Sequence, residues 1–239
     1  MADVVFPPRC GGCERLGTLF CATCWEDVRP LTPPYCPQCG QPTTAPQRCA
    51  RCQRTSFEAL NGARAAALHV GPMRQAIHRF KYRGETRLAR PLAAYMATRT
   101  GHRRLRSQVL IPVPLHLTRL ARRGYNQSAL LAQNLSRSLA IPVVEDAVIR
   151  QQATRPQVTL RAADRWRNMA NAFRCVHPEA VRGARVLVID DVMTTGSTLD
   201  ACAVALKEAG AKEVWGYTLA RAVFASAQAS PPDHPMFAT

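Results

Sequence analysis

The stretch from Val186 to Leu199, VLVIDDVMTTGSTL, restricts the possible folds of this chain more than any other. It opens with four apolar residues, three of them β-branched, and such a run suits a strand that is buried on both faces of a parallel sheet. Two carboxylates follow, then a turn rich in hydroxyl groups, then apolar residues at helical spacing. The pattern predicts a strand, an acidic pair, a turn and a helix. The turn then lies at the carboxyl end of a strand, where open α/β sheets bind their ligands.

The turn that begins at Thr194 carries groups that suit a phosphate. Backbone N–H groups at a helix N-terminus attract anions, and Gly196 lets the backbone approach a bound group closely. The hydroxyl donors of the turn are Thr194, Thr195, Ser197 and Thr198. The alternative is an ordinary strand–turn–helix connection with a Ser or Thr cap, which accounts poorly for the whole run.

The acidic pair Asp190 and Asp191 does not fit a phosphate alone, because two carboxylates repel it. Carboxylates suit sugar hydroxyls, or a hydrated Mg²⁺ that arrives with the ligand. A ligand that combines a phosphate, a diol and a metal-bound diphosphate is phosphoribosyl diphosphate. The stretch therefore predicts a site for phosphoribosyl diphosphate with Mg²⁺.

Eight of the ten cysteines form four Cys-x-x-Cys pairs near the N-terminus. Each pair can present two thiolates to one Zn²⁺, and four thiolates close a tetrahedral site with no position left for water. The pattern therefore predicts two structural zinc sites, in a module with too few apolar residues to fold without metal. The pairs are Cys10/Cys13, Cys21/Cys24, Cys36/Cys39 and Cys49/Cys52.

The spacing leaves two features of this module open. The first pair can join the second and the third the fourth, which we favour, or the pairs can interleave as first with third and second with fourth. Iron–sulfur ligation is a further alternative to zinc. A disulfide framework is disfavoured because the chain shows no secretion signal.

The charge balance of 32 Lys and Arg against 16 Asp and Glu gives a net charge of +16. Such a charge favours polyanionic partners, namely nucleic acid, anionic lipid or phosphorylated small molecules, although a coding bias toward Arg explains part of it. No segment has the roughly 18 apolar residues that a membrane span needs, so the sequence predicts no membrane insertion and a cytoplasmic protein. No Gly-x-Gly or Gly-Lys-Ser/Thr motif occurs, which argues against the commonest dinucleotide and nucleoside triphosphate sites.

Two basic segments precede the acidic pair. Lys81-Tyr82-Arg83-Gly84 predicts a turn that closes over an anionic substrate, or else a plain surface turn. Arg119, Arg122 and Arg123 stand before a predicted helix N-terminus and suggest a clamp for a diphosphate. Strands are predicted at 63–70, 108–114, 143–149 and 213–220, and helices are predicted to begin at Gly71, at Thr86 and after residue 127.

Several motifs together resemble one family. They are the four cysteine pairs, K-Y-R-G at 81–84, P-V-P-L at 112–115, R-R-G-Y-N-Q at 122–127 and I-D-D-V-M-T-T-G-S-T at 189–198. This combination resembles the ComF family, also called GntX. The resemblance implies an α/β fold of the type I phosphoribosyltransferase kind, with a largely parallel sheet flanked by helices and a small N-terminal double zinc ribbon. It also implies a link to natural competence and to the use of DNA as a nutrient.

The resemblance implies roles for individual residues. Asp190 and Asp191 would be catalytic and hold the ribose, and a loop at Thr154–Gln157 would cover the site. Binding of phosphoribosyl diphosphate with Mg²⁺ is expected at Lys81, Pro112, Val113, Pro114, Arg122, Arg123, Asp190, Asp191, Thr194, Thr195, Gly196, Ser197 and Thr198.

The predicted organisation is a zinc module at 1–57, a phosphoribosyltransferase-like domain at 58–222 and a disordered tail at 223–239. Expected partners are phosphoribosyl diphosphate or a nucleotide, with single-stranded DNA and competence proteins as further candidates. Two alternatives to an enzyme stay open: a sensor that binds the ligand without turnover, and a single-stranded DNA-binding accessory protein of DNA uptake.

Overall fold

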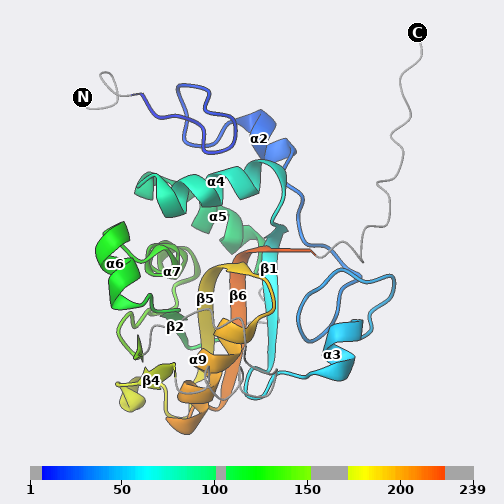
Figure 1. Cartoon of the computed structure of the whole chain (residues 1–239), viewed down its shortest axis with the longest axis vertical. Coiled ribbons are helices and arrows are strands. Elements are labelled where there is room, and N and C mark those ends of the chain that lie inside the picture. The colour runs from blue at the N-terminus through cyan, green and yellow to red at the C-terminus, as the bar shows by residue number, and fades with distance from the viewer. Residues whose placement is uncertain (1–6, 101–105, 152–171, 224–239) are drawn as a thin grey trace.

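The computed structural model of the chain, shown in Figure 1, describes residues 7–100, 106–151 and 172–223. Its centre is a four-stranded sheet in the order β1-β6-β5-β2. All three strand pairings in this sheet are parallel, which confirms the predicted α/β fold class. The strands are β1 (Gly62–Leu68), β2 (Val109–Pro112), β5 (Arg185–Met193) and β6 (Glu213–Arg221).

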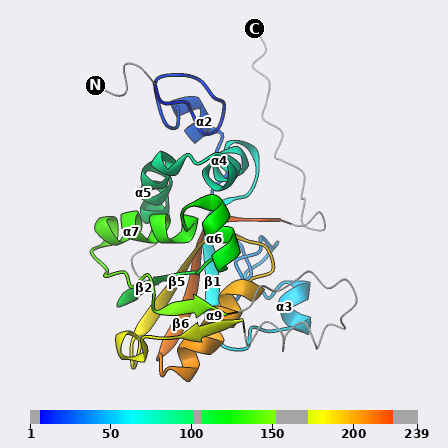
Figure 2. The same cartoon turned by 60° about the vertical axis from the view of Figure 1, so that its left-hand side comes forward.

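Helices cover both faces of the sheet, so β5 is buried on both sides (Figures 1 and 2). Leu187 and Ile189 pack into one apolar cluster with helices α5 (Ala89–Arg99) and α7 (Gln127–Leu139), and Val186 and Val188 pack into a second cluster with helix α9 (Ser197–Glu208). Burying one such side chain contributes about 1.5–3 kcal/mol, so this alternation fixes the strand firmly in the sheet. The helices are α4 (Gly71–Tyr82), α5 (Ala89–Arg99), which follows the 3₁₀ turn η1 (Thr86–Leu88), α6 (Leu117–Arg123), α7 (Gln127–Leu139) and α9 (Ser197–Glu208).

The strand predicted at 143–149 is wrong in its extent. Val143 makes a single parallel bridge to Leu110, the chain then bends, and β3 (Val148–Arg150) pairs antiparallel with β4 (Phe173–Cys175). The bend carries Glu145 and Asp146, which are exposed, and such residues are disfavoured in strands. A short 3₁₀ turn, η2 (Pro178–Ala180), lies between β4 and β5.

The two halves of the cysteine module lie on different parts of the molecule (Figures 1 and 2). The first half contains α2 (Ala22–Glu26) and packs on α4 and α5, where Trp25 stacks on Tyr95 with ring centroids 5.2 Å apart. The second half contains α3 (Ala50–Arg54) and lies beside β1, with the backbone N–H of Ala63 donating to Gln38 at 2.8 Å.

The connection from the second half to β1 is held by a buried carboxylate. Asp200, in the first turn of α9, accepts hydrogen bonds from the backbone N–H groups of Glu58, Ala59 and Leu60 at 2.9, 3.0 and 2.9 Å.

The predicted domain boundary after residue 57 stays a proposal. The loop expected at Thr154–Gln157 and the tail expected at 223–239, apart from Val223, lie outside the described residues.

Within the described ranges, no helix is both long enough and apolar enough to cross a membrane.

Candidate functional site

The acidic pair lies inside β5, near its carboxyl end, and the hydroxyl-rich turn follows directly. Gly196 is the N-cap of α9 with φ +84°, a left-handed conformation that favours glycine. A Cβ at this position would also lie 2.8 Å from Cζ of Phe57, so the turn needs glycine for two reasons. The close neighbour at Gly196 in the structure is thus Phe57, and the expected approach of the turn to a bound phosphate stays a prediction.

The hydroxyl groups of the turn are organised around the start of α9. The Oγ atoms of Thr195 and Ser197 are 2.8 Å apart, and Oγ1 of Thr195 accepts from the backbone N–H of Ser197 at 3.3 Å. The first N–H groups of a helix have no partner within the helix itself. The turn therefore combines hydroxyl groups with helix N–H donors, as an anion site requires.

The two carboxylates of the acidic pair have different surroundings. Oδ1 of Asp190 accepts from Oγ of Ser128 at 2.8 Å and from the backbone N–H of Asp191 at 2.9 Å. Burial, together with the neighbouring charge of Asp191, raises the pKa of Asp190 to about 7. At neutral pH Asp190 is therefore close to the midpoint of its titration.

Asp191 is buried and forms an ion pair with Lys81, whose Nζ lies 2.7 Å from Oδ1. Its second oxygen, Oδ2, is buried and has no hydrogen-bond partner within the part of the chain that the structure describes. Lys81 is part of α4 and not of a free turn, and the chain leaves the helix through Arg83 and Gly84. Lys81 therefore reaches the predicted site as a partner of the acidic pair.

Asn126 and Ser128 connect the acidic pair to the Pro-Val-Pro turn, and the sequence did not single them out. Asn126 is the N-cap of α7, where its Oδ1 accepts from the N–H of Ser128 at 3.0 Å and its Nδ2 donates to the carbonyl of Val113 at 3.0 Å. Val113 in turn donates its N–H to the carbonyl of Ile189 at 2.9 Å. The only sequence signal was Asn126 within the R-R-G-Y-N-Q motif. These hydrogen bonds link Val113 to β5 and to the start of α7, and the expected role of Pro112–Pro114 in binding the ligand stays a prediction.

The arginines of this motif lie in α6, a short helix that the sequence analysis did not predict. Arg122 and Arg123 occupy its last turn, where cations are favourable, and Gly124 ends it with φ +80°. Arg123 donates to Oε1 of Gln127, and its guanidinium lies 5.4 Å from the ring centroid of Tyr82. The structure therefore gives Arg123 two protein partners, and its role in binding a diphosphate stays a prediction.

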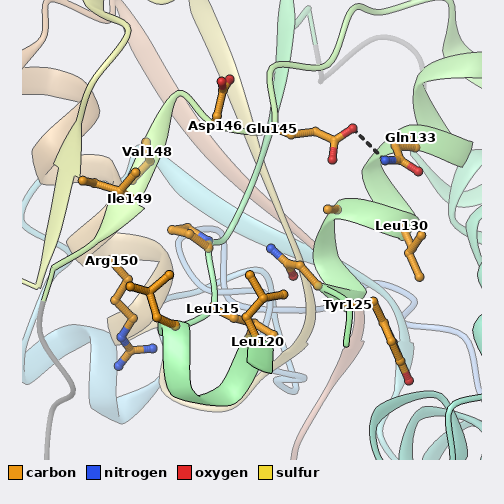
Figure 3. A pocket seen from close by; sticks show the side chains of 14 residues that line it. Leu115, Leu120, Tyr125, Leu130, Gln133, Glu145, Asp146, Val148, Ile149 and Arg150 are labelled. Carbon is orange, nitrogen blue, oxygen red and sulfur yellow. Dashed lines mark hydrogen bonds between the residues drawn. The ribbon is translucent and has the colours of Figure 1, made fainter. Parts of the chain in front are cut away.

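A cavity of about 570 Å³ opens beyond Pro114 (Figure 3). One wall comes from α6 and the start of α7, with Leu120 and Tyr125, and the opposite wall from β3, with Ile149 and Arg150. Glu145 lies on a third side of the cavity, where its Oε1 accepts a hydrogen bond from Nε2 of Gln133 at 2.7 Å. Pro114 lines the cavity, so the cavity adjoins a segment, Pro112–Pro114, that is expected to bind phosphoribosyl diphosphate.

The eight cysteines assemble into two groups of four, each with its sulfur atoms within 4.8 Å of one another. A tetrahedral Zn²⁺ with Zn–S bonds of about 2.3 Å needs sulfur atoms about 3.8 Å apart. The Sγ atoms of Cys13 and Cys21 are 3.6 Å apart, and those of Cys39 and Cys49 are 3.7 Å apart, so both groups fit Zn²⁺. The groups are Cys10, Cys13, Cys21 and Cys24, and Cys36, Cys39, Cys49 and Cys52, which confirms sequential pairing and contradicts interleaving.

Comparison with family models divides the chain in the same way. Residues 1–53 match the double zinc ribbon domain, and residues 125–237 match the phosphoribosyl transferase domain.

Among curated proteins, competence protein F of Haemophilus influenzae is 36% identical over 212 residues, which cover 85% of this chain and 90% of that protein. DNA utilization protein YhgH of Escherichia coli is 35% identical, over 84% of this chain and 90% of that protein. Competence protein ComFC of Bacillus subtilis is 27% identical, over 84% and 83%. Among solved structures, glutamine phosphoribosylpyrophosphate amidotransferase of B. subtilis matches 54% of this chain and 25% of its own, at 22% identity and a TM-score of 0.38.

Metal analysis of the purified chain should give two Zn²⁺ per molecule, because each group of four thiolates closes one site. A variant in which Cys10, Cys13, Cys21 and Cys24 are all replaced by Ser should retain one Zn²⁺. Interleaved pairing would leave that variant without a complete site. Iron, or one Zn²⁺ per wild-type molecule, would contradict the assignment.

Asp190→Asn should raise the free energy of unfolding at pH 8 by about 4 kcal/mol. The raised pKa of Asp190, about 7, means that the carboxyl stabilises the fold below the unfolded value near pH 4 and loses this contribution as the pH rises through 7. Asn resembles the uncharged form, so the difference from wild type should grow between pH 4 and 7 and stay constant above. Urea unfolding between pH 4 and 8 measures it, with the exposed Asp27→Asn as control. A difference that does not change with pH would refute the assignment.

Proposed function

The chain belongs to the family of competence protein F and DNA utilization protein YhgH, and from this premise we propose that it binds phosphoribosyl diphosphate with Mg²⁺ at the carboxyl end of β5. In this proposal it is a phosphoribosyltransferase-like protein that serves the uptake of DNA or its use as a nutrient. The family name supports the biological role, and the geometry of the acidic pair and the turn supports the ligand.

The observation that carries the ligand is the buried, unpartnered Oδ2 of Asp191 among the described residues. A buried carboxylate oxygen without a donor costs about 1–3 kcal/mol or more, so a ligand that brings a hydroxyl group or a cation is favoured there. Ribose hydroxyls and Mg²⁺ both meet that requirement, and carboxylate oxygens are the ligands that Mg²⁺ prefers. A ligand that carries phosphate alone does not.

The remaining residues fit the rest of the ligand. The turn at Thr194–Thr198 would hold the 5′-phosphate, so that binding energy from this end orients the reacting end. Lys81, released from its ion pair with Asp191, would move toward the diphosphate beside Pro112–Pro114. Bound Mg²⁺ would neutralise charge on the departing diphosphate.

If turnover occurs, the bond between ribose C1 and the diphosphate oxygen breaks and a nucleophile adds to C1. Asp190 and Asp191 would stabilise the positive charge that develops on the ribose. The cavity next to Pro114 is a candidate entry for the nucleophile. A sensor would use the same residues for binding and omit this step.

Phosphoribosyl diphosphate with Mg²⁺ should stabilise the chain by about 2.7 kcal/mol at a ligand concentration one hundred times the dissociation constant. The double variant Asp190→Asn, Asp191→Asn should lose most of this effect in a thermal-shift measurement, whereas Asp27→Asn should keep it. No stabilisation of the wild type at millimolar ligand would refute the proposal. Diphosphate release in the presence of candidate bases or amines separates an enzyme from a sensor.

A second function, binding of single-stranded DNA, is favoured by Tyr82. Its side chain, at the end of α4, is 61% exposed, and its ring centroid lies 5.0 Å from that of His78. The guanidinium of Arg123 lies 5.4 Å from the same ring centroid, although the two residues are far apart in the sequence. An exposed ring with a guanidinium beside it suits a base that stacks and a phosphate next to it. The sequence showed no such arrangement, because the fold creates it.

Tyr82→Ala should weaken binding of a single-stranded oligonucleotide about tenfold, with an unchanged salt dependence, because it removes stacking and no charge. Arg123→Ala should lower the slope of log affinity against log salt by about one. Leu16→Ala, at another exposed apolar side chain, is the control. Fluorescence anisotropy at several salt concentrations measures both quantities. A slope near zero for the wild type, or equal effects of Tyr82→Ala and Leu16→Ala, would argue against this function.

A further inference from the structure

The hydroxyl-rich turn is held from outside the transferase-like domain. Arg51, in α3 of the second zinc ribbon, donates through its guanidinium to the backbone carbonyl of Thr195. Arg51 stands between two cysteines of the second group, Cys49 and Cys52. A residue fixed by the metal site therefore contacts the turn that is proposed to bind the phosphate.

Phe57 makes a second link between the same parts. It packs against the cysteines of the second group, and it also packs against the cluster that contains Leu199 of α9. The position that a Cβ of residue 196 would occupy lies 2.8 Å from the ring. The ring therefore fills the space on the zinc side of Gly196 and restricts the turn there.

The second ribbon is also attached to the sheet beside this turn. Arg221, at the end of β6, is buried and donates through Nε to Oε1 of Gln41 at 3.0 Å and through Nη2 to Sγ of Cys39 at 3.5 Å. Asp200 fixes the connection that follows Phe57, through its three backbone hydrogen bonds. The ribbon is thus tied to the start of α9 and to the end of β6, on both sides of the turn.

The bond from Arg51 determines an orientation. A trans peptide is planar, with its C=O and N–H pointing in opposite directions. A guanidinium on the carbonyl of Thr195 therefore directs the N–H of Gly196 away from the ribbon. It also places a positive charge one peptide unit from the donors that would meet a phosphate.

We propose that the second zinc ribbon is a working part of the phosphate site, and that Arg51 and Phe57 are positioning residues for the turn at Thr195 and Gly196. Zinc binding and ligand binding are then coupled, because zinc fixes the ribbon and the ribbon fixes the turn. Thermodynamic linkage makes the coupling reciprocal, so the ligand must also strengthen the hold on this zinc. The proposal rests on the function proposed above and adds a role for the ribbon.

The first test compares two arginines of α3. Arg51→Ala should weaken binding of phosphoribosyl diphosphate with Mg²⁺ about tenfold in calorimetry, with two Zn²⁺ per chain retained in metal analysis. Arg54→Ala removes the same charge from an exposed position on the same short helix and should leave the affinity unchanged. Equal affinities of Arg51→Ala and Arg54→Ala would overturn the proposal.

The second test measures zinc release, first from the wild-type chain and then from Arg51→Ala. Transfer of Zn²⁺ to a coloured chelator is followed with and without saturating phosphoribosyl diphosphate and Mg²⁺. One of the two Zn²⁺ should leave about tenfold more slowly with ligand, and this protection should shrink in Arg51→Ala. If the ligand binds but leaves the release rates of both Zn²⁺ unchanged, the inference is overturned and the proposed function stays intact. No binding of the ligand to the wild type would overturn both.

Discussion

Burial of β5 on both of its faces is the constraint on which the rest of the structure depends. Leu187 and Ile189 face α5 and α7, and Val186 and Val188 face α9, so any shift in register by one residue would exchange both sets. The strand continues past this apolar run, and Asp190 and Asp191 therefore occupy the next two positions of a buried strand. The side chain of Asp191 lies on the same face of the strand as that of Ile189, toward α4, and forms an ion pair with Lys81. The packing that stabilises the fold is thus the cause of the unusual electrostatics of the acidic pair.

A second constraint is that the zinc-ribbon module is short and has few apolar residues. Thiolate–zinc bonds take the place of a hydrophobic core, so in such modules the free energy of metal binding is also free energy of folding. The two ribbons pack against different parts of the molecule. The first packs Cys10, Phe20 and Cys24 into the apolar cluster that α4 and α5 share, while the second packs around Phe57 and lies against the turn that begins α9. The second ribbon, unlike the first, therefore contacts the turn of the candidate site directly.

Local sequence patterns predicted the parts of this fold whose cause is local. The apolar run, the turn and the stripe of Leu199 and Leu206 specified β5 and α9, and the cysteine spacing specified both zinc groups. What escaped prediction depends on contacts between distant segments. The hydrogen bond from Ser128 to Asp190, like that from Arg51 to Thr195, joins residues that no periodicity relates. The bend at Glu145 and the short helix α6 were missed because neither buries an apolar stripe that would reveal it.

The state of the acidic pair determines which ligands the site can favour. Lys81 already satisfies one oxygen of Asp191, and Ser128 and a backbone N–H satisfy one oxygen of Asp190. A phosphate without hydroxyl groups would meet the hydroxyl-rich turn but would bring no donor to Oδ2 of Asp191. A ligand with a diol brings that donor, and one with a diphosphate also offers Lys81 a new partner when the ion pair opens. The cost of separating a buried ion pair is several kcal/mol unless the new partners replace it. In the proposed function the buried pair would therefore act as a selectivity element, favouring a ligand that carries phosphate, diol and diphosphate together over any one of these groups alone.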